Sequence, residues 1–405
     1  MRKKILFLAG MMACCSLAGA QEISKTWVAD KGNGTYQNPV LHADYSDPDV
    51  CAAGDDFYMT ASSFNCIPGI PILHSNDLVN WSLVNYALPI QEPEEFFDKA
   101  QHGKGVWAPA IRFHNGEFYI YWGDPDYGIY MIKAKDPKGR WSKPVLVKAG
   151  KGMIDPTPLW DEDGKVYLVH AYAGSRSGVN SIVVICELNA EGTEVISDPV
   201  MVFDGNDGKN HTVEGPKLYK RNGYYYIFAP AGGVATGWQL VLRSKNIYGP
   251  YESKIVMAQG KTNINGPHQG GWVDTNTGES WFVHFQDKGA YGRVIHLNPM
   301  TWVNDWPVIG VDKDEDGCGE PVTTYKKPNV GKTYPIATPP ESDEFNTRHL
   351  GLQWQWHANK KDTYGFTTDL GYIRLYAGSL SKEFVNFWEV PNLLMQKSVS
   401  YTHLT

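Results

Sequence analysis

Alternating apolar and polar residues recur around tight polar turns along most of the chain, from Tyr36 to about Pro328. Each pair of runs flanking such a turn is typical of a β-hairpin with one buried face. The five predicted hairpins are DVCAAGDDFYMTAS, IRFHNGEFYIYW, LWDEDGKVYLVHAY, LYKRNGYYYIFAP and WVDTNTGESWFVHF. We therefore expect an all-β structure over this part of the chain.

The hairpins return with a nearly constant spacing. Their turn glycines are Gly54, Gly116, Gly164, Gly223 and Gly278, with steps of 62, 48, 59 and 55 residues. A second strand-like element follows each hairpin at a similar lag, so one supersecondary unit is repeated five times. Four strands per unit form the blade of a β-propeller. A β-sandwich would also contain many hairpins, but it would not explain the fixed period. The pattern favours a five-bladed β-propeller.

The character of the chain changes after Pro339, where ESDEFNTRHLGLQWQWHANKKDTYGF begins a new aromatic, strand-like segment behind a linker rich in Pro and Lys. We expect a propeller over residues 21–330, a linker over 331–340 and an incomplete C-terminal β-sandwich over 341–405.

The N-terminus has the features of an export signal. MRKKILFLAGMMACCSLAGAQ combines a basic start, a short apolar core and small residues before Gln21, which predicts a signal peptide over residues 1–20. Lipidation at Cys14 or Cys15 is the alternative. No other apolar run reaches the ~20 residues of a membrane span. We expect an exported protein, periplasmic or extracellular, without a membrane span.

Composition narrows the classes of partner. A formal charge of −7 and a pI near 5.9 argue against nucleic acid as a partner, because no basic stripe is present. The 14 Trp and 23 Tyr residues suit a sugar, whose C–H faces stack on flat rings. After removal of the signal peptide four cysteines remain, which we expect to be buried free thiols; a disulfide between Cys51 and Cys66 is the alternative.

The strand that enters each hairpin carries a functional side chain close to a proline. Five such residues lie 7 to 10 positions before the turn glycine and are taken as equivalent: Asp47, Trp107, Asp155, Glu214 and His268. Because the innermost strands of a propeller line its channel, we expect these side chains to converge on one axis.

Three acids at one position of three blades indicate catalysis. Carboxylates that share a cavity raise one another's pKa, as expected where one group must stay protonated. Glycosidic hydrolysis requires two carboxylates beside the scissile bond, and a third acid can orient and tune the proton donor. We expect Trp107 and Phe64 to supply stacking surfaces. Arg293 either reaches the axis to hold sugar hydroxyls or lies on the blade surface.

Five ordered motifs resemble those of glycoside hydrolase family 43. They are NPVLHADYSDPDV, GVWAPAIRFHNGEFYIYW, IDPTPLWDEDGKVYLVHA, HTVEGPKLYKRNGYYYIFAPAGG and GRVIHLNPM, and the resemblance covers about residues 36 to 330. It implies a propeller enzyme in which Asp47 is the general base, Asp155 orients and tunes the donor, and Glu214 is the general acid. It also implies that Arg293 contacts substrate and that His268 lies near the channel centre. Single displacement with inversion, the implied mechanism, places base and acid ~6.5–9.5 Å apart.

The resemblance implies an exo-acting β-xylosidase or α-L-arabinofuranosidase acting on plant cell-wall oligosaccharides or polysaccharides such as xylan, arabinoxylan or arabinan. Cys66 departs from the pattern, since an aromatic residue is expected there. The alternatives are an endo-arabinanase, a retaining fructosidase or a non-catalytic carbohydrate-binding propeller. No cofactor is expected to be required, although His268 is the candidate residue beside a structural calcium ion. Asp312, Asp314 and Asp316 lack the glutamate of an EF-hand and are interpreted as a solvated turn.

Overall fold

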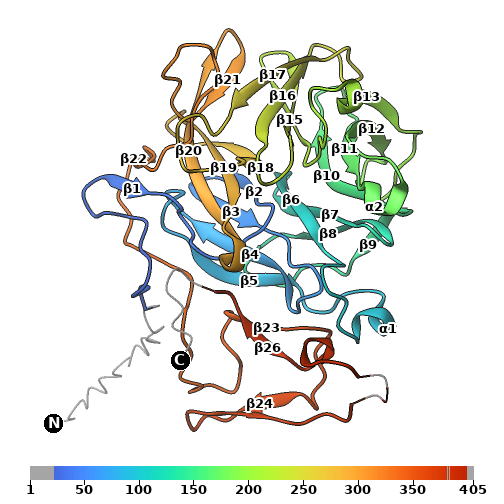
Figure 1. Cartoon of the computed structure of the whole chain (residues 1–405), viewed down its shortest axis with the longest axis vertical. Helices are drawn as coiled ribbons and strands as arrows, with labels where there is room; N and C mark the ends of the chain where they lie inside the picture. Colours follow the sequence, from blue (N-terminus) through green and yellow to red (C-terminus); the bar gives the residue numbers. More distant parts are fainter. Residues whose placement is uncertain (1–21, 381, 383, 399–405) are drawn as a thin grey trace, which may run out of the picture.

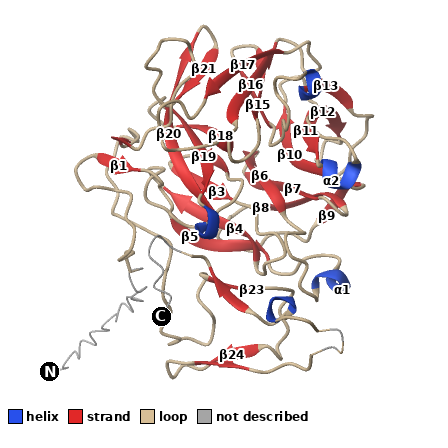
Figure 2. Ribbon diagram, viewed as in Figure 1, coloured by secondary structure: helices blue, strands red, loops and turns tan. Residues whose placement is uncertain are grey.

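Strands dominate the computed structural model, which describes residues 22–380, 382 and 384–398. The predicted signal peptide and the two cysteines considered for lipidation lie outside the described residues. The short helical elements of the described part are α1 (Glu94–Phe97), α2 (Gly174–Ser177), η1 (Gly205–Asp207), η2 (Gly289–Tyr291) and η3 (Phe387–Glu389) (Figure 2). No helix within the described ranges is long and apolar enough to cross a membrane. The predicted all-β fold class is confirmed.

Five antiparallel sheets of four strands surround a common axis (Figure 1). Blade 1 contains β2 (Asp49–Ala53), β3 (Asp56–Thr60), β4 (Gly69–Ser75) and β5 (Ser82–Leu88). Blade 2 contains β6 (Trp107–His114), β7 (Glu117–Asp124), β8 (Gly128–Ala134) and β9 (Val145–Ala149). Blade 3 contains β10 (Met153–Trp160), β11 (Val166–Tyr172), β12 (Ile182–Leu188) and β13 (Val200–Asp204). Blade 4 contains β14 (Lys217–Arg221), β15 (Tyr224–Ala231), β16 (Trp238–Ser244) and β17 (Glu252–Met257). Blade 5 contains β18 (His268–Asp274), β19 (Ser280–Asp287), β20 (Arg293–Val303) and β21 (Trp306–Ile309). The five-bladed propeller is confirmed.

The turn between the first two strands of each blade is the one that the repeat predicts. All five turn glycines have positive φ, between 66° and 87°, a region that glycine adopts without the steric penalty of a side chain. Each blade therefore begins with the hairpin expected from its glycine.

The core is divided among the junctions between blades. Alternation along a strand sends side chains to both faces of a blade, and each face packs against the next blade. Five buried apolar clusters result in the described part of the chain. For example, Phe57 and Met59 of blade 1 share a cluster with Trp281 and Val283 of blade 5, whereas Tyr58 of blade 1 packs with blade 2. This packing holds the first strands around the channel.

The chain entering blade 1 closes the ring by pairing with blade 5. Leu41 bridges Ile295 on β20, and Tyr45 N–H donates to the carbonyl of Arg293 at 3.1 Å. Asn38 adds side-chain bonds to both backbone groups of Leu297. This closure sets Arg293 beside the start of blade 1 although about 250 residues of sequence separate them.

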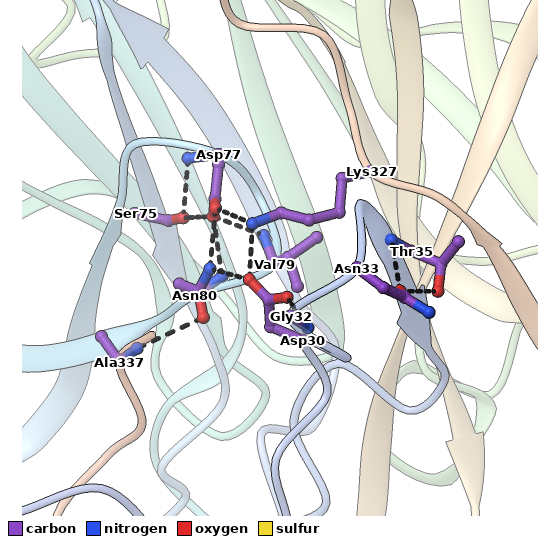
Figure 3. A network of polar contacts seen from close by, with 10 residues as sticks. All are labelled: Asp30, Gly32, Asn33, Thr35, Ser75, Asp77, Val79, Asn80, Lys327 and Ala337. Atoms are coloured by element: carbon purple, nitrogen blue, oxygen red, sulfur yellow. Dashed lines mark hydrogen bonds and ion pairs between the residues drawn. The ribbon is translucent and has the colours of Figure 1, made fainter. Parts of the chain in front are cut away.

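A buried network of charges reinforces the closure (Figure 3). Lys327 Nζ bonds to Asp30 Oδ2 and lies 2.8 Å from Asp77 Oδ2. Asn80 Nδ2 donates to both carboxylates at 2.8 and 2.7 Å, and its Oδ1 accepts from Ala337 N–H. The network connects the N-terminal segment, the end of β4 and the chain beyond blade 5. A further pairing of β1 (Thr35–Gln37) with β22 (Thr324–Lys326) lies nearby.

The C-terminal segment forms two small sheets against blade 1. Its strands are β23 (Trp354–Trp356), β24 (Gly365–Thr367), β25 (Ile373–Leu375) and β26 (Leu394–Gln396), with β23 paired to β26 and β24 to β25. Trp356 bridges Ile67, and Asn65 Nδ2 donates to the carbonyl of His357 at 2.7 Å. The segment thereby supports the loop that carries Phe64.

The four cysteines in the described part are free thiols, so the alternative of a Cys51–Cys66 disulfide is wrong. Cys51 and Cys186 are buried as expected, whereas Cys66 and Cys318 are only partly buried. Both of these residues lie outside the strands.

Candidate active site

In each blade, one residue in the left-handed region lies within two positions of the first residue of the innermost strand. These residues are Asp47, Ala108, Asp155, Gly215 and Gln269, with φ of 55°, 40°, 58°, 61° and 40°. In blades 2, 3 and 5 the pairing register shifts across this residue. Residues other than glycine rarely adopt this conformation outside turns, and they also occur at functional sites, where the surrounding structure maintains it. The five-fold repeat is thus visible in the backbone itself.

This repeat corrects the sequence alignment of the five candidate residues by one position. Asp47 and Asp155 occupy the left-handed position, whereas Trp107, Glu214 and His268 directly precede it. The hairpin glycine misled the alignment because the number of residues between it and the left-handed position varies among blades.

Asp47 is buried and fully engaged at the start of blade 1. Its Oδ2 accepts from Ser62 Oγ at 2.7 Å and Ser46 Oγ at 3.1 Å, while Arg293 Nη1 donates to its Oδ1 at 2.6 Å. Ser62 Oγ also accepts from Ala108 N–H, which ties Asp47 to blade 2. These three hydrogen bonds fix the orientation of the Asp47 carboxylate.

Asp155 lies near the start of blade 3 and has a raised pKa. Its side chain is buried, and its Oδ2 accepts from the N–H of Gly215 at 2.7 Å. Burial, together with the nearby Glu214 carboxylate, raises the pKa of Asp155 to about 7 against the opposing effects of Lys217 and Gly215. Gly215 is required here, since a Cβ would lie 2.5 Å from Cγ of Gln269. Asp155 and Glu214 are therefore linked through one residue.

Glu214 is the most accessible of the three acids, with its side chain 35% exposed. Its Oε1 lies 3.0 Å from Nε2 of His268, whose ring is completely buried. The histidine orients one carboxyl oxygen and leaves the exposed part of the group available for a substrate.

Arg293 reaches the axis, and its surface alternative is wrong. Besides Asp47 it bonds to Ser46 Oγ at 3.0 Å, and its guanidinium lies 4.6 Å from the centre of the Phe285 ring. The negative charges of Asp47 and Glu214 both raise the pKa of Arg293, with Asp47 the larger effect. The arginine therefore lies within the electrostatic field of the base and acid candidates.

The two predicted stacking residues come from neighbouring blades, with Phe64 in the loop between β3 and β4 and Trp107 at the start of β6. Phe64 and Val106 exchange both backbone hydrogen bonds at 3.0 and 3.1 Å, which places Trp107 next to this pair. Both rings are partly exposed, and Trp107 Nε1 donates to the carbonyl of Gly103. Arg176 lies 5.6 Å from the Trp107 ring centre.

Four polar residues near the acids were missed by sequence reasoning: Ser62, Asp49, Arg112 and Lys217. Asp49 Oδ2 accepts from the N–H of Ile111 and from Arg112, and Lys217 is completely buried. The alternation of strands was a usable signal, because Asp49 and Lys217 each lie two residues beyond a left-handed position and so face the same side.

His268 Nε2 lies 3.0 Å from Oε1 of Glu214. Among the described residues no group of three or more His, Cys, Asp or Glu could hold a metal ion, and a calcium ion beside His268 stays a prediction. Asp312 accepts from the N–H of Gly317, as in the predicted turn.

The geometry defines a class of protein. Three carboxylates at the starts of blades 1, 3 and 4 lie within electrostatic range of one another, and Arg293 bonds to one of them and lies against the Phe285 ring. Such a set of residues can supply the acid and the base of a glycosidase.

Comparison with known proteins identifies the family. Residues 36–307 match the model of glycosyl hydrolases family 43, and residues 342–403 match the β-xylosidase C-terminal Concanavalin A-like domain. A Xylanibacter ruminicola protein assigned as a β-xylosidase is 42% identical over 93% of this chain and 68% of its own length. A non-reducing end α-L-arabinofuranosidase of Bacteroides ovatus is 32% identical over 84% of this chain and 65% of its own. The crystal structure of a xylan β-1,4-xylosidase from Bacillus halodurans superposes with a TM-score of 0.77 at 26% identity, covering 90% of this chain and 72% of the other. The chain belongs to glycoside hydrolase family 43 and is a glycosidase.

Proposed function

We propose that this enzyme releases terminal β-D-xylosyl or α-L-arabinofuranosyl units from plant cell-wall oligosaccharides or polysaccharides by inversion. The observation that carries the proposal is the convergence of Asp47, Asp155 and Glu214 at one end of the channel, with Arg293 bonded to Asp47. The names of the relatives, which include β-xylosidases and α-L-arabinofuranosidases, support the two sugars.

In the proposed reaction Asp47 removes a proton from water, whose oxygen attacks the anomeric carbon. Glu214 gives its proton to the departing glycosidic oxygen, so that the C–O bond breaks with a neutral leaving group. Asp155 accepts a hydrogen bond from the N–H of Gly215, the residue that follows Glu214 in the chain. In the proposed reaction this bond lets Asp155 orient the proton donor.

The support for exo action comes from the neighbourhood of Phe64 and Trp107. The Phe64 loop joins the start of β6 through the backbone of Phe64 and Val106, and the C-terminal segment contacts the Phe64 loop at Asn65 and Ile67. Ser62 bonds both to Asp47 and to the N–H of Ala108, which keeps Trp107 near the proposed base. Aromatic rings near the base suit stacking on a terminal sugar.

The anomeric form of the first-formed sugar tests the mechanism. Proton NMR of xylobiose hydrolysis should show α-xylose before mutarotation, since a single displacement inverts the β-linkage. A first product with the β-configuration would instead support the retaining alternative, which needs two carboxyls only ~5–5.5 Å apart. A parallel series with an α-L-arabinofuranoside decides which of the two sugars is preferred.

We also propose export to the periplasm or beyond, supported by the basic and apolar pattern of residues 1–20. Cell fractionation of the full chain, with and without these residues, is the test. Retention of both forms in the cytoplasm would contradict the proposal.

A further inference from the structure

A second cavity lies among the five inner strands, and none of the three acids lines it. Three consecutive residues from each of β2, β6, β10, β14 and β18 form its wall, and its volume is about 410 Å³. These residues follow the left-handed residue of their blade by three positions (Asp47 to Val50) to six (Ala108 to His114), which is roughly 10–20 Å of extended strand. Ligand sites usually measure about 300–1,000 Å³, so this rear cavity has the size of one.

Five aromatic rings line the rear cavity. They are Phe113 and His114 from blade 2, Trp160 from blade 3, Tyr219 from blade 4 and Trp272 from blade 5. Phe113 is 42% exposed, and the other four are partly exposed. His114 stacks on Trp160 with ring centres 4.6 Å apart, and the ring of Tyr219 lies 5.1 Å from that of Trp272. Flat rings that neighbouring blades hold in place offer stacking surfaces to a ligand at a low cost in conformational entropy.

The charged side chains of the rear cavity favour a neutral ligand. Its two cations are already compensated, because Arg112 pairs with Asp49 and Lys220 pairs with Asp161. The exposed carboxylate of Asp274 forms no ion pair within the described part of the chain. An anionic ligand such as a phosphate ester would therefore meet an unbalanced negative charge. A neutral molecule with apolar faces and hydroxyl groups fits this wall, and a sugar has both.

We propose that the rear cavity is a second carbohydrate-binding site, which holds a few sugar units of a neutral pentose polysaccharide without hydrolysing them. The C–H faces of the sugar stack on the rings, and its hydroxyl groups donate to the carboxylate of Asp274. The three acids stand at the other end of the inner strands, so a bound chain does not reach them. The choice of a pentose rests on the proposed function, whereas the choice of a neutral sugar rests on the wall of the cavity.

The test is native electrophoresis through gels that contain soluble arabinoxylan, with linear arabinan in a parallel series. Asp47→Asn is the parent protein, so that the polymer is not cut during the run. The parent should be retarded by at least one of the two polymers. Adding Phe113→Ala or Trp160→Ala should raise the Kd calculated from the retardation by about fivefold or more, because each removes one stacking surface.

Two further variants of the parent serve as controls. Phe366 of β24 lies outside the rear cavity and is 44% exposed, close to the value for Phe113, so Phe366→Ala should leave the Kd unchanged. Trp107→Ala removes a ring near the proposed base and should also keep the retardation. With Asp47 restored, Phe113→Ala should hydrolyse 4-nitrophenyl glycosides at the wild-type rate, which shows that the fold is intact and makes Phe113→Ala decisive if Trp160→Ala does not fold.

The outcomes separate the second site from the proposed function. Retardation that is lost in Trp107→Ala but kept in Phe113→Ala and Trp160→Ala would place the polymer at the acids and overturn the inference. A parent that neither polymer retards, or equal retardation of all variants, would overturn it as well. If the wild type hydrolyses neither the β-xyloside nor the α-L-arabinofuranoside, the proposed function fails, and the gels still decide whether the rear cavity binds sugar.

Discussion

Two buried clusters in this propeller both contain carboxylates and cations, but they differ in how many of their polar atoms form hydrogen bonds. In the closure network Lys327 bonds to Asp30 and lies beside Asp77, and Asn80 donates to both carboxylates (Figure 3). In the channel, Nζ of Lys217, Oδ1 of Asp49 and Nη2 of Arg112 make no hydrogen bond within the described part of the chain. The first cluster satisfies its members, whereas the second leaves several of them unpaired.

The backbone differs between the two clusters in the same way. Asp47 and Asp155 of the channel are held at positive φ, and neither Asp30 nor Asp77 is. Unpaired buried groups and left-handed residues each cost free energy, and they persist where chemistry needs them. We conclude that the closure network contributes stability to the fold, and that the channel cluster gives up stability for reactivity.

Replacing the proposed base should give the largest effect on activity and almost none on stability. For Asp47→Asn we expect kcat/KM to fall by 10³- to 10⁴-fold, about 4–5 kcal/mol, because the amide cannot take a proton from water. The loss should be the same for xylobiose and for 2,4-dinitrophenyl β-xyloside, an aryl glycoside whose leaving group needs little protonation. Hydrolysis of both substrates needs the attacking water. The free energy of unfolding should change by about 1 kcal/mol or less, since Arg293 is 30% exposed and keeps its bond to Ser46.

Chemical denaturation and steady-state kinetics on the same preparations check this prediction. Glu214→Gln is the comparison variant, because it should lose activity mainly on xylobiose. An Asp47→Asn enzyme with activity within tenfold of wild type would remove Asp47 from the role of base.

Replacing the cation of the closure network should have the opposite effect. Lys327→Met leaves two buried carboxylates facing each other, with side chains only 4% and 2% exposed. We expect a loss of about 3–5 kcal/mol in the free energy of unfolding, the usual result of removing one partner of a buried ion pair. The value of kcat/KM per folded molecule should not change.

Lys332 provides the matched control for Lys327. It pairs with Asp55 at 3.1 Å, but the two side chains are 63% and 50% exposed, so Lys332→Met should cost less than about 1 kcal/mol. Equal losses in the two variants would show that the closure network adds no more than an ordinary surface pair.

The sequence predicted the propeller and the three acids but not how their charges are compensated. Each hairpin turn is determined by residues that are adjacent in the sequence, so the five turn glycines predicted all five blades. Arg293 remained undecided because its partner Asp47 lies 246 residues away and meets it only through ring closure. Lys217 was missed because KLYKR has the composition of a solvated strand, and only its distance from the left-handed Gly215 shows which way it faces. Pairing across a closed ring is a property of the whole fold.

The raised pKa of Asp155 gives a smaller effect that distinguishes the two clusters by pH. Since the folded pKa, about 7, lies above the unfolded value of ~3.9, the folded state binds more protons between these values and stability falls as pH rises through them. Asp155→Asn removes this dependence, so the variant should match wild type near pH 4 and exceed its stability by roughly 3–4 kcal/mol at pH 8. Its activity should fall at both values. Urea unfolding at the two pH values is the measurement, and a variant less stable than wild type at pH 8 would contradict the stability cost assigned to the channel.

The smallest expected effect lies at the mouth of the channel, where a charge is near the site but belongs to neither cluster. Arg176 lies against the Trp107 ring and pairs with Asp126 at 3.2 Å, with the two side chains 26% and 22% exposed. A partly exposed cation beside an aromatic ring contributes about 0.5–1 kcal/mol, so Arg176→Met should raise KM for xylobiose about two- to fivefold. The value of kcat should stay unchanged, because Arg176 bonds to none of the three acids in the described structure. Trp107→Ala in the same assay removes the ring itself and should raise KM further. A fall in kcat for Arg176→Met would mean that the charge of Arg176 acts on the acids, and Arg176 would then belong to the channel cluster.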